Sequence, residues 1–230
     1  MIPHTHPQPS SVPEPPRLLA IETSGIACGV AMSVGSRIVA SHSHHVPHVH
    51  DRLLAGMVER MMSDHAVTWQ DIDAVAVSAG PGSFTGLRIG VSLAKALCTS
   101  GQPRLVGVPT MVALATEAVA RGVSRDHARI VTAYASQRGQ LYTQAFDIAG
   151  AALTEPVLIS SERFPEMVTE GTLVCSTDVL PDLHMDSVMV IPLRAEFLVP
   201  VALGMLKHGQ VHDSDRFVPL YVQDFVPKSV

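Results

Sequence analysis

The apolar positions of the chain first follow the period of strands and then that of a helix. Residues 18–24, 27–34 and 37–43 are short apolar runs separated by turns that contain glycine, which predicts three strands. From residue 51 to 64 the apolar side chains fall on one side of a helix. They are Leu53, Leu54, Met57, Val58, Met61 and Met62. The chain is therefore expected to begin with strands and continue with an amphipathic helix.

A similar order of strands and helices occurs again further along the chain. A valine-rich run at 73–79 predicts a buried strand, a glycine-rich turn follows it, and helices are expected over 87–99 and from 110 to about 121. The later elements are expected to be strands over 129–135, 140–146 and 153–159, a helix over 162–170, a strand over 172–176 and a helix over 195–208. This order indicates two α/β lobes of similar design, or two unrelated α/β units.

The glycine-rich turn carries candidate chemistry. Residues 80–90 read GPGSFTGLRIG. Glycines allow close approach of a ligand or of another backbone, while Ser83 and Thr85 could cap the helix or offer hydroxyls to an anion. Three residues separate Gly82 from Gly86, which excludes G-x-G-x-x-G, and no Lys-Ser or Lys-Thr pair follows Gly86, which excludes a Walker loop. An anion site and a structural turn without ligand both stay open.

The string around this turn resembles the signature of the TsaB (YeaZ) family. The resemblance rests on residues 80–90 and the Ala-Lys pair that follows at 94–95, on LAIETS at 19–24, and on RGQLY at 138–142. It covers residues 18–142 well and the remainder by the order of elements. The resemblance implies a two-lobed, actin-like ASKHA (RNase H-like) α/β fold, with mixed sheets flanked by helices.

The element order and the resemblance together divide the chain into three segments. Residues 1–16 are rich in proline and histidine and are expected to form a disordered lead-in. Residues 17–105 are expected to form the first ASKHA lobe, and residues 106–230 the second, with the C-terminal segment returning to the first lobe. The run FVPLYVQ at 217–223 is loosely similar to the Pro-x-Tyr-Leu-Arg of the family, with Gln223 in place of the basic residue.

The resemblance implies a subunit role in tRNA modification. TsaB is the non-catalytic partner of TsaD, an ASKHA paralogue that transfers a threonylcarbamoyl group to N6 of adenosine 37 in tRNA (t6A37). A TsaE-like ATPase and a homodimer are further expected partners, with tRNA reached only through the complex. TsaD-like chains have a metal-binding His-x-x-x-His shortly after the glycine turn, whereas residues 105–116 contain no histidine. Neither a catalytic residue nor a metal site is therefore expected.

A small ASKHA phosphotransferase or nucleotide hydrolase acting alone is the alternative. Such an enzyme needs one acid for magnesium, a second acid as base, and phosphate loops in both lobes. Glu22 could supply the first acid or could instead brace the adjoining turn. TsaB relatives commonly have an Asp where Ala135 or Ser136 stands, and the sequence contains no second glycine-rich phosphate loop. Magnesium-dependent turnover would separate the two hypotheses.

Two hydrolase classes are disfavoured by missing residues. A glycoprotease-like metallopeptidase would need the histidine pair that residues 105–116 lack. The G-x-S-x-G motif of a serine hydrolase would need glycine where Thr85 follows Ser83. Ser83 is therefore expected to act as a helix cap.

The partner interface is expected on two helices. The helix over 87–99 has small residues at four-residue spacing, and the methionine-bearing helix over 53–62 suits an adaptable interface, although both helices could simply cover their own sheet. The expected interface residues are Leu53, Met57, Met61, Arg88, Gly90, Val91, Ala94, Lys95 and Cys98.

The candidate nucleotide or anion turn is a second set of residues. It comprises Glu22, Thr23, Ser24, Gly80, Gly82, Ser83, Thr85 and Gly86. No cofactor is expected to be required, and ATP or ADP is the candidate ligand, bound at an interface of the complex.

Composition limits the classes that remain. The net charge of -5, without a Lys/Arg cluster, argues against a protein that binds nucleic acid alone. The three cysteines lie far apart without a C-x-x-C, and no apolar run approaches the roughly 20 residues of a membrane helix, so a cytoplasmic protein without membrane attachment is expected. Pro47 and Gly209 interrupt the two His-x-x-x-His spacings at 44–48 and 208–212, which disfavours a metal site on a helix at either place.

Overall fold

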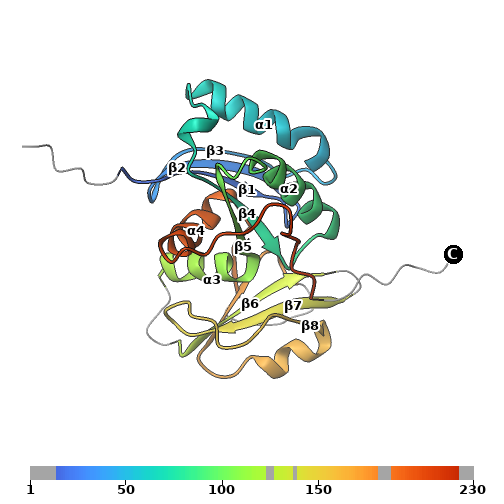
Figure 1. The fold of residues 1–230 in the computed structure, drawn as a ribbon. Coiled ribbons are helices and arrows are strands. Elements are labelled where there is room, and N and C mark those ends of the chain that lie inside the picture. Colours follow the sequence, from blue (N-terminus) through green and yellow to red (C-terminus); the bar gives the residue numbers. More distant parts are fainter. Residues whose placement is uncertain (1–13, 123–126, 137–138, 181–187, 223–230) are drawn as a thin grey trace, which may run out of the picture.

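The computed structural model describes residues 14–122, 127–136, 139–180 and 188–222. The chain forms two five-stranded sheets, with helices between them and on their outer faces (Figure 1). The expected fold class, two lobes of mixed sheets flanked by helices, is confirmed. Most of the predicted lead-in, together with Arg138 and Gln223 of the resemblance, lies outside the described residues.

The first sheet has the strand order β3-β2-β1-β4-β5. β1 pairs antiparallel with β2 and parallel with β4, which in turn pairs parallel with β5. β4 is buried along its whole length, as expected for a central parallel strand covered on both faces, and this explains its uninterrupted run of small and apolar residues. The strands are β1 (Arg17–Glu22), β2 (Cys28–Val34), β3 (Arg37–His44), β4 (Ala74–Gly80) and β5 (Arg104–Pro109).

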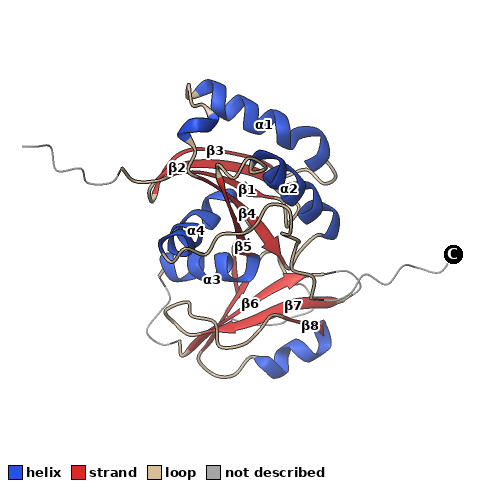
Figure 2. Ribbon diagram, viewed as in Figure 1, coloured by secondary structure: helices blue, strands red, loops and turns tan. Residues whose placement is uncertain are grey.

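Helices α1 (His50–Asp64) and α2 (Phe84–Leu97) cover the outer face of the first sheet (Figure 2). The apolar stripe that predicted α1 faces inward, where its side chains join those of β1, β2, β4 and α2 in one core. The period of 3.6 residues thus identified both the helix and the side that it buries.

The second sheet has the order β10-β9-β6-β7-β8, and α3 (Thr110–Ala120) and α4 (Leu198–Lys207) lie between the two sheets (Figure 1). One core cluster contains Leu18 of β1, Leu114 of α3, Ile130 of β6 and Leu198 of α4. The two lobes therefore share a core. The strands are β6 (Arg129–Ala135), β7 (Gln140–Phe146), β8 (Val157–Ser160), β9 (Thr172–Ser176) and β10 (Val188–Val190).

The structure corrects two of the predicted elements. The strand expected over 153–159 begins only at Val157, because Leu153 N donates to the carbonyl of Ala145 at 2.8 Å and folds that segment back along β7. The α-helix expected over 162–170 is instead the 3-10 helix η2 (Ser161–Met167), in which Pro165 lacks the N–H that an α-helix would use.

Three further features were not expected from the sequence. β5 and β10 were not predicted, since β10 has only three residues and β5 contains a glycine and a proline. The helix expected over 195–208 begins as the 3-10 turn η3 (Ala195–Phe197) and continues as α4. Because β5 completes the first sheet, the predicted lobe boundary between residues 105 and 106 falls inside a strand.

The last described residues return to the first lobe. Residues 212–222, called here the C-terminal strap, cross β5 and reach the beginning of α2 (Figure 1). Near the first described residues, Gly35 N donates to the carbonyl of Pro16 at 2.8 Å. Within the described ranges, every helix is too short or too polar to cross a bilayer.

Candidate functional site

The first residues of the turn after β1, Thr23 and Ser24, lie beneath the glycine-rich turn and are fully buried. Ser24 donates from its backbone N at 2.5 Å and from its hydroxyl at 2.6 Å to Oε1 of Glu22. Burial raises the pKa of the Glu22 carboxyl from 4.5 to about 7, against the opposing effect of the Ser24 hydrogen bonds. Glu22 Oε2 has no hydrogen-bond partner among the described residues. In this structure Glu22 braces the turn, which was the alternative to a magnesium-binding role.

The glycines of the signature make room for this buried turn. A Cβ at Gly82 would meet the Ser24 carbonyl oxygen, and a Cβ at Gly86 would meet the Thr23 carbonyl oxygen. One at Gly90 would meet Thr23 Oγ1. The close approach that glycine permits is therefore used here by the chain's own backbone and side chains.

Ser83 caps α2, as predicted. Its Oγ accepts a hydrogen bond from Gly86 N at 3.2 Å, and its own N donates to the Ser24 carbonyl at 2.7 Å. These contacts use two of the N–H groups near the start of the helix. Thr85, one residue into the helix, is exposed.

A cavity of about 300 Å³ opens beside the cap. Three predicted residues, Ser83, Thr85 and Gly86, line it, whereas Glu22 and Thr23 lie buried beneath the turn. Its other walls come from the β1–β2 turn, the start of α1, the side of α2 and the second sheet. These walls are Gly25, Ile26, Pro47, His48, His50, Asp51, Ile89 and Tyr134. The cavity thus combines hydroxyl, imidazole and carboxylate groups with apolar side chains.

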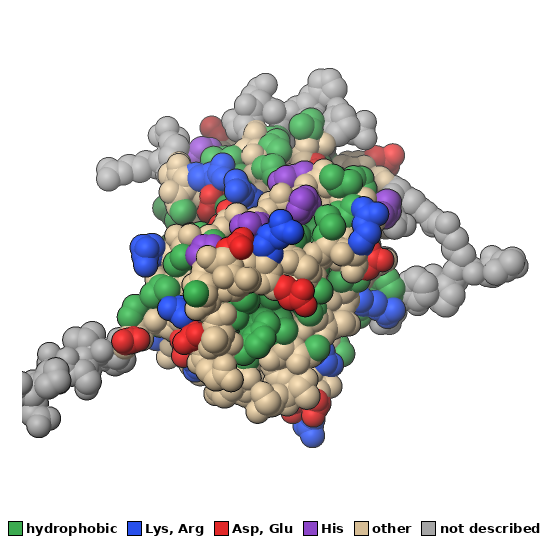
Figure 3. Space-filling model, turned by 90° about the horizontal axis from the view of Figure 1, so that it is seen from above, with side chains coloured by type: hydrophobic (Ala, Val, Ile, Leu, Met, Phe, Trp, Pro, Cys, Tyr) green, Lys and Arg blue, Asp and Glu red, His purple; other side chains and the backbone are tan. Residues whose placement is uncertain are grey.

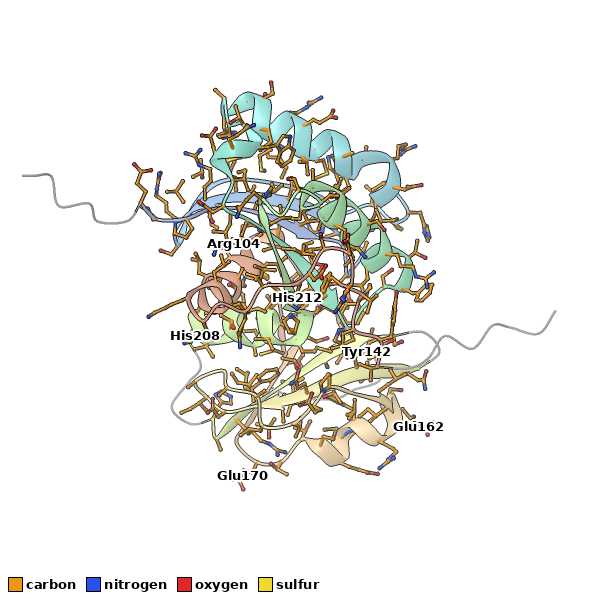
Figure 4. All side chains as sticks on the ribbon, in the orientation of Figure 1. Arg104, Tyr142, Glu162, Glu170, His208 and His212 are labelled. Atoms are coloured by element: carbon orange, nitrogen blue, oxygen red, sulfur yellow. The ribbon has the colours of Figure 1, made fainter. Side chains whose placement is uncertain are left out.

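Tyr134 brings the second lobe to this cavity. It ends β6, and its hydroxyl donates to the Ser24 carbonyl at 2.6 Å. Its ring centroid lies 6.2 Å from that of Tyr142 on β7, which Figure 4 labels. Burial raises the pKa of Tyr134, so its hydroxyl keeps the proton that it donates. The β1 turn is therefore held by α2 on one side and by the second lobe on the other.

The predicted partner-interface residues are mostly buried inside the first lobe. Met57, Met61, Val91, Ala94 and Cys98 belong to its core. Gly90 is buried against Thr23, Leu53 and Lys95 are half-buried, and Arg88 is exposed. On the small-residue face of α2, Gly86 and Gly90 pack on Thr23 of the β1 turn, while Ala94 and Cys98 pack in the core of the first lobe. In this conformation the buried members of the set cannot contact a partner, and the helices offer their outer sides instead.

The outer sides of α1 and α2 form one continuous surface. Seen from above, charged and histidine side chains on it are interspersed with apolar ones (Figure 3). The exposed positions of α2 are Thr85, Arg88, Ser92 and Ala96, and those of α1 include Arg52, Ala55, Gly56, Glu59 and Arg60. Such a mixed surface suits a polar interface better than a fully apolar one.

The histidines in the second His-x-x-x-His spacing have separate backbone partners. His208 Nδ1 lies 2.8 Å from the Gly204 carbonyl at the end of α4, and His212 Nδ1 accepts from Gly107 N at 3.1 Å (Figure 4). Burial lowers the pKa of His212, which keeps this nitrogen free to accept. Among the residues that the structure describes, no three His, Cys, Asp or Glu side chains are grouped so that they could bind a metal ion.

Two parts of this site were missed in the sequence. The contact of Tyr134 with the turn joins residues more than 100 positions apart, for which periodicity carries no signal. The C-terminal segment was expected to return to the first lobe, but its contact with β5 was not identified, although Gly107 in β5 was an available sign. A Cβ there would meet the ring of Phe217, so the glycine leaves space for the returning chain.

Comparisons with known proteins identify the family. The family model for TsaD, tRNA N6-adenosine threonylcarbamoyltransferase, matches residues 40–176, more than half of the chain. The tRNA threonylcarbamoyladenosine biosynthesis protein TsaB of Escherichia coli K12 is 29% identical over 228 residues, covering 91% of this chain and 96% of that protein. A tRNA N6-adenosine threonylcarbamoyltransferase of Tropheryma whipplei is 33% identical over 124 residues, which is 47% of this chain and 31% of that one.

A solved structure agrees in fold. YeaZ from Pseudomonas aeruginosa superposes with a TM-score of 0.74 at 23% identity, covering 90% of this chain and 99% of that chain. The chain belongs to the family that the matching model describes and is, within it, a TsaB (YeaZ) protein.

Proposed function

We propose that this chain is a non-catalytic subunit of the complex that makes N6-threonylcarbamoyladenosine at position 37 of tRNA. In this role it binds a TsaD-like transferase in the cytoplasm and supports its activity. The observation that carries the proposal is similarity to a TsaB protein of the threonylcarbamoyladenosine pathway over 91% of this chain. A second, weaker similarity to the transferase itself fits a pair of related subunits.

The positions that would hold catalytic groups have structural contacts in this chain. Glu22 is buried and receives both hydrogen bonds of Ser24. Residues 105–116, which correspond by resemblance to the metal-binding segment of TsaD-like chains, form β5 and the first half of α3. There Met111 and Leu114 are fully buried in the shared core. These contacts support a role in assembly rather than in the chemical step.

The surface proposed for the transferase is the outer side of α1 and α2. These two helices lie side by side on one face of the first sheet and expose a mixed polar and apolar surface (Figures 1 and 3). A second copy of this chain would use the same surface in a homodimer, so the transferase and the second copy would compete. We further propose that ATP or ADP binds beside Ser83 and Thr85 at an interface of the complex, where a TsaE-like ATPase is the third component.

Light scattering and a modification assay test the proposal together. The molar mass of the protein is measured alone and after mixing with the TsaD-like protein of the same cell. The mixture, supplied with the threonylcarbamoyl donor, ATP and the TsaE-like ATPase, is then assayed for threonylcarbamoyladenosine in tRNA. We expect a stoichiometric complex, and modification only when both proteins are present. No association, together with magnesium-dependent ATP turnover by this protein alone, would overturn the proposal in favour of a stand-alone phosphotransferase or hydrolase.

A further inference from the structure

The C-terminal strap is fixed to the first lobe at both ends. At its start, His212 N donates to the Leu105 carbonyl at 2.8 Å, and His212 Nδ1 accepts from Gly107 N. Near its end, Leu220 N donates to the Ala79 carbonyl at 2.7 Å. The strap therefore continues the contacts of β4 and β5 without being a regular strand.

Side chains hold the middle of the strap in place. The ring of Phe217 occupies the space that Gly107 leaves open, and it lies 4.6 Å from the His212 ring, centroid to centroid. Lys95 of α2 donates to two strap carbonyls, those of Asp215 at 3.2 Å and Phe217 at 3.0 Å. A positive φ of 107° at Gly80 and the closeness of the Leu220 carbonyl leave no room for a side chain at position 80. The path of the strap is thus set by glycines and by Lys95.

The last part of the strap, residues 218–221, exposes apolar side chains and ends beside a cation, whereas its first part exposes the charged residues Asp213, Asp215 and Arg216. Val218 is 68% exposed, Leu220 43% and Tyr221 39%. The Tyr221 hydroxyl accepts from Arg88 Nε at 3.1 Å, and the Arg88 guanidinium lies 3.9 Å from the centre of the Phe84 ring. Among the described residues, no carboxylate lies within ion-pair distance of Arg88. A backbone held at many points therefore displays apolar side chains next to a positive charge that has no ion-pair partner in the part of the chain that the structure describes.

We propose that Val218, Leu220, Tyr221 and Arg88 form a docking surface for the TsaD-like transferase. The surface fits a partner that presents apolar side chains to the strap and a carboxylate to Arg88. Arg88 has a fixed orientation on the Phe84 ring, which favours a directional ion pair. The inference rests on the proposed function, because it names where on this chain the partner of that function binds.

Three features favour the transferase as the partner that binds this surface. The strap surface is continuous with the outer side of α2, since Arg88 belongs to both, so one partner can cover both. The net charge of the chain is -5, yet on this surface Arg88 has no carboxylate partner among the described residues, so the surface complements a partner that presents a carboxylate. Buried aromatic and arginine side chains are also those that most often dominate binding energy at an interface.

Affinity measurements on charge variants test the proposal. Val218→Asp and Arg88→Glu are compared with the wild-type protein in titrations against the TsaD-like transferase of the same cell. Val211→Asp is the matched control, because Val211 is also exposed, at 44%, but lies outside the proposed surface, in the turn between α4 and the strap. We expect at least tenfold weaker binding for Val218→Asp and for Arg88→Glu, and less than twofold change for the control. Arg88→Lys should recover part of the loss, since it keeps the charge without the planar stacking.

Each outcome bears on one of the two proposals. All variants should melt within about two degrees of the wild-type protein, because the altered side chains are exposed. If Val218→Asp and Arg88→Glu both bound with wild-type affinity, while Ser92→Arg on the outer side of α2 blocked binding, the proposed docking surface would be overturned and the proposed function would stand. An equal loss in Val211→Asp would also overturn it, since the effect would then be one of net charge. Absence of binding by the wild-type protein would overturn the proposed function and this surface with it.

Discussion

The ionisation of Glu22 is changed strongly by its surroundings. The sequence placed Glu22 at the end of a strand and left two roles open. The burial of Glu22 depends on α2 and on Tyr134, which come from distant parts of the chain. The residue pattern alone therefore could not choose between a magnesium-binding role and a role in bracing the turn. The structure supplies a physical consequence: a carboxyl that is protonated near neutral pH and whose ionisation costs stability.

Replacing Glu22 by Gln should remove one component of the pH dependence of folding. Well below pH 4.5 the carboxyl is protonated in both the folded and the unfolded state, so its raised pKa does not lower stability there. Between pH 4.5 and about 7 the unfolded state loses its proton while the folded state keeps it, so stability falls as pH rises and levels off above about 7. The shift corresponds to about 3 kcal/mol.

Urea unfolding at several pH values from 4 to 8 measures this component. The difference in free energy of unfolding between Glu22→Gln and the wild-type protein should move in favour of the variant as pH rises through this range. Other carboxyl groups contribute equally to both proteins and cancel in the difference. A difference that stays constant with pH would show that the Glu22 pKa is not raised.

A side chain at Gly86 should lower the stability of the protein, whereas one at Gly56, on the outer surface of α1, should not. In Gly86→Ala the new Cβ would meet the Thr23 carbonyl oxygen, a backbone atom that cannot move freely, and we expect a loss of about 2–3 kcal/mol. Gly56 on α1 has no atom within 4 Å of a Cβ, so Gly56→Ala should stabilise the helix by about 0.5–1 kcal/mol. Thermal unfolding of both variants gives the comparison, and equal melting temperatures would contradict this account of the signature.

At the scale of elements, the sequence predicted where helices occur better than what they face. The helix expected over 87–99 starts three residues earlier, at Phe84, because Ser83 caps it. Its small residues were expected to face a partner helix, but Gly86 and Gly90 pack on Thr23, and Ala94 and Cys98 lie in the core of the first lobe. Spacing along a helix shows that a close neighbour exists and does not show which one. β5 escaped prediction for a related reason, since its glycine serves the strap rather than the strand.

Lys95 should control how firmly the strap is held. Lys95→Met keeps most of the aliphatic length but loses both donations to strap carbonyls, and we expect a loss of stability of about 1–2 kcal/mol. Amide hydrogen exchange should accelerate in residues 213–222, above all at Leu220 N. Lys207→Met at the exposed end of α4 is the control and should leave exchange in the strap unchanged. Equal protection of the strap in both variants would mean that Phe217 and His212 hold it without Lys95.

At the scale of the whole molecule, the two lobes are less separate than the order of elements suggested. Two runs of strands and helices predicted two lobes correctly. The helices α3 and α4, however, lie between the sheets, and their core joins residues of β1, β5, β6 and β9. A pattern of local periods shows which side of each element is apolar, but not that one apolar layer serves two sheets. The shared core predicts that neither lobe unfolds alone.

The cysteines provide a test of this cooperativity. Cys28 and Cys98 lie in the core of the first lobe, Cys175 lies in the shared core, and all three thiols are buried. In increasing urea, brief thiol labelling read by mass spectrometry should give the same midpoint at all three sites. Leu114→Ala, which opens a cavity in the shared core, should lower all three midpoints together, by about 3 kcal/mol in stability. If Cys175 became reactive while Cys28 and Cys98 stayed protected, the second lobe would unfold independently, and the shared core would not couple the two lobes.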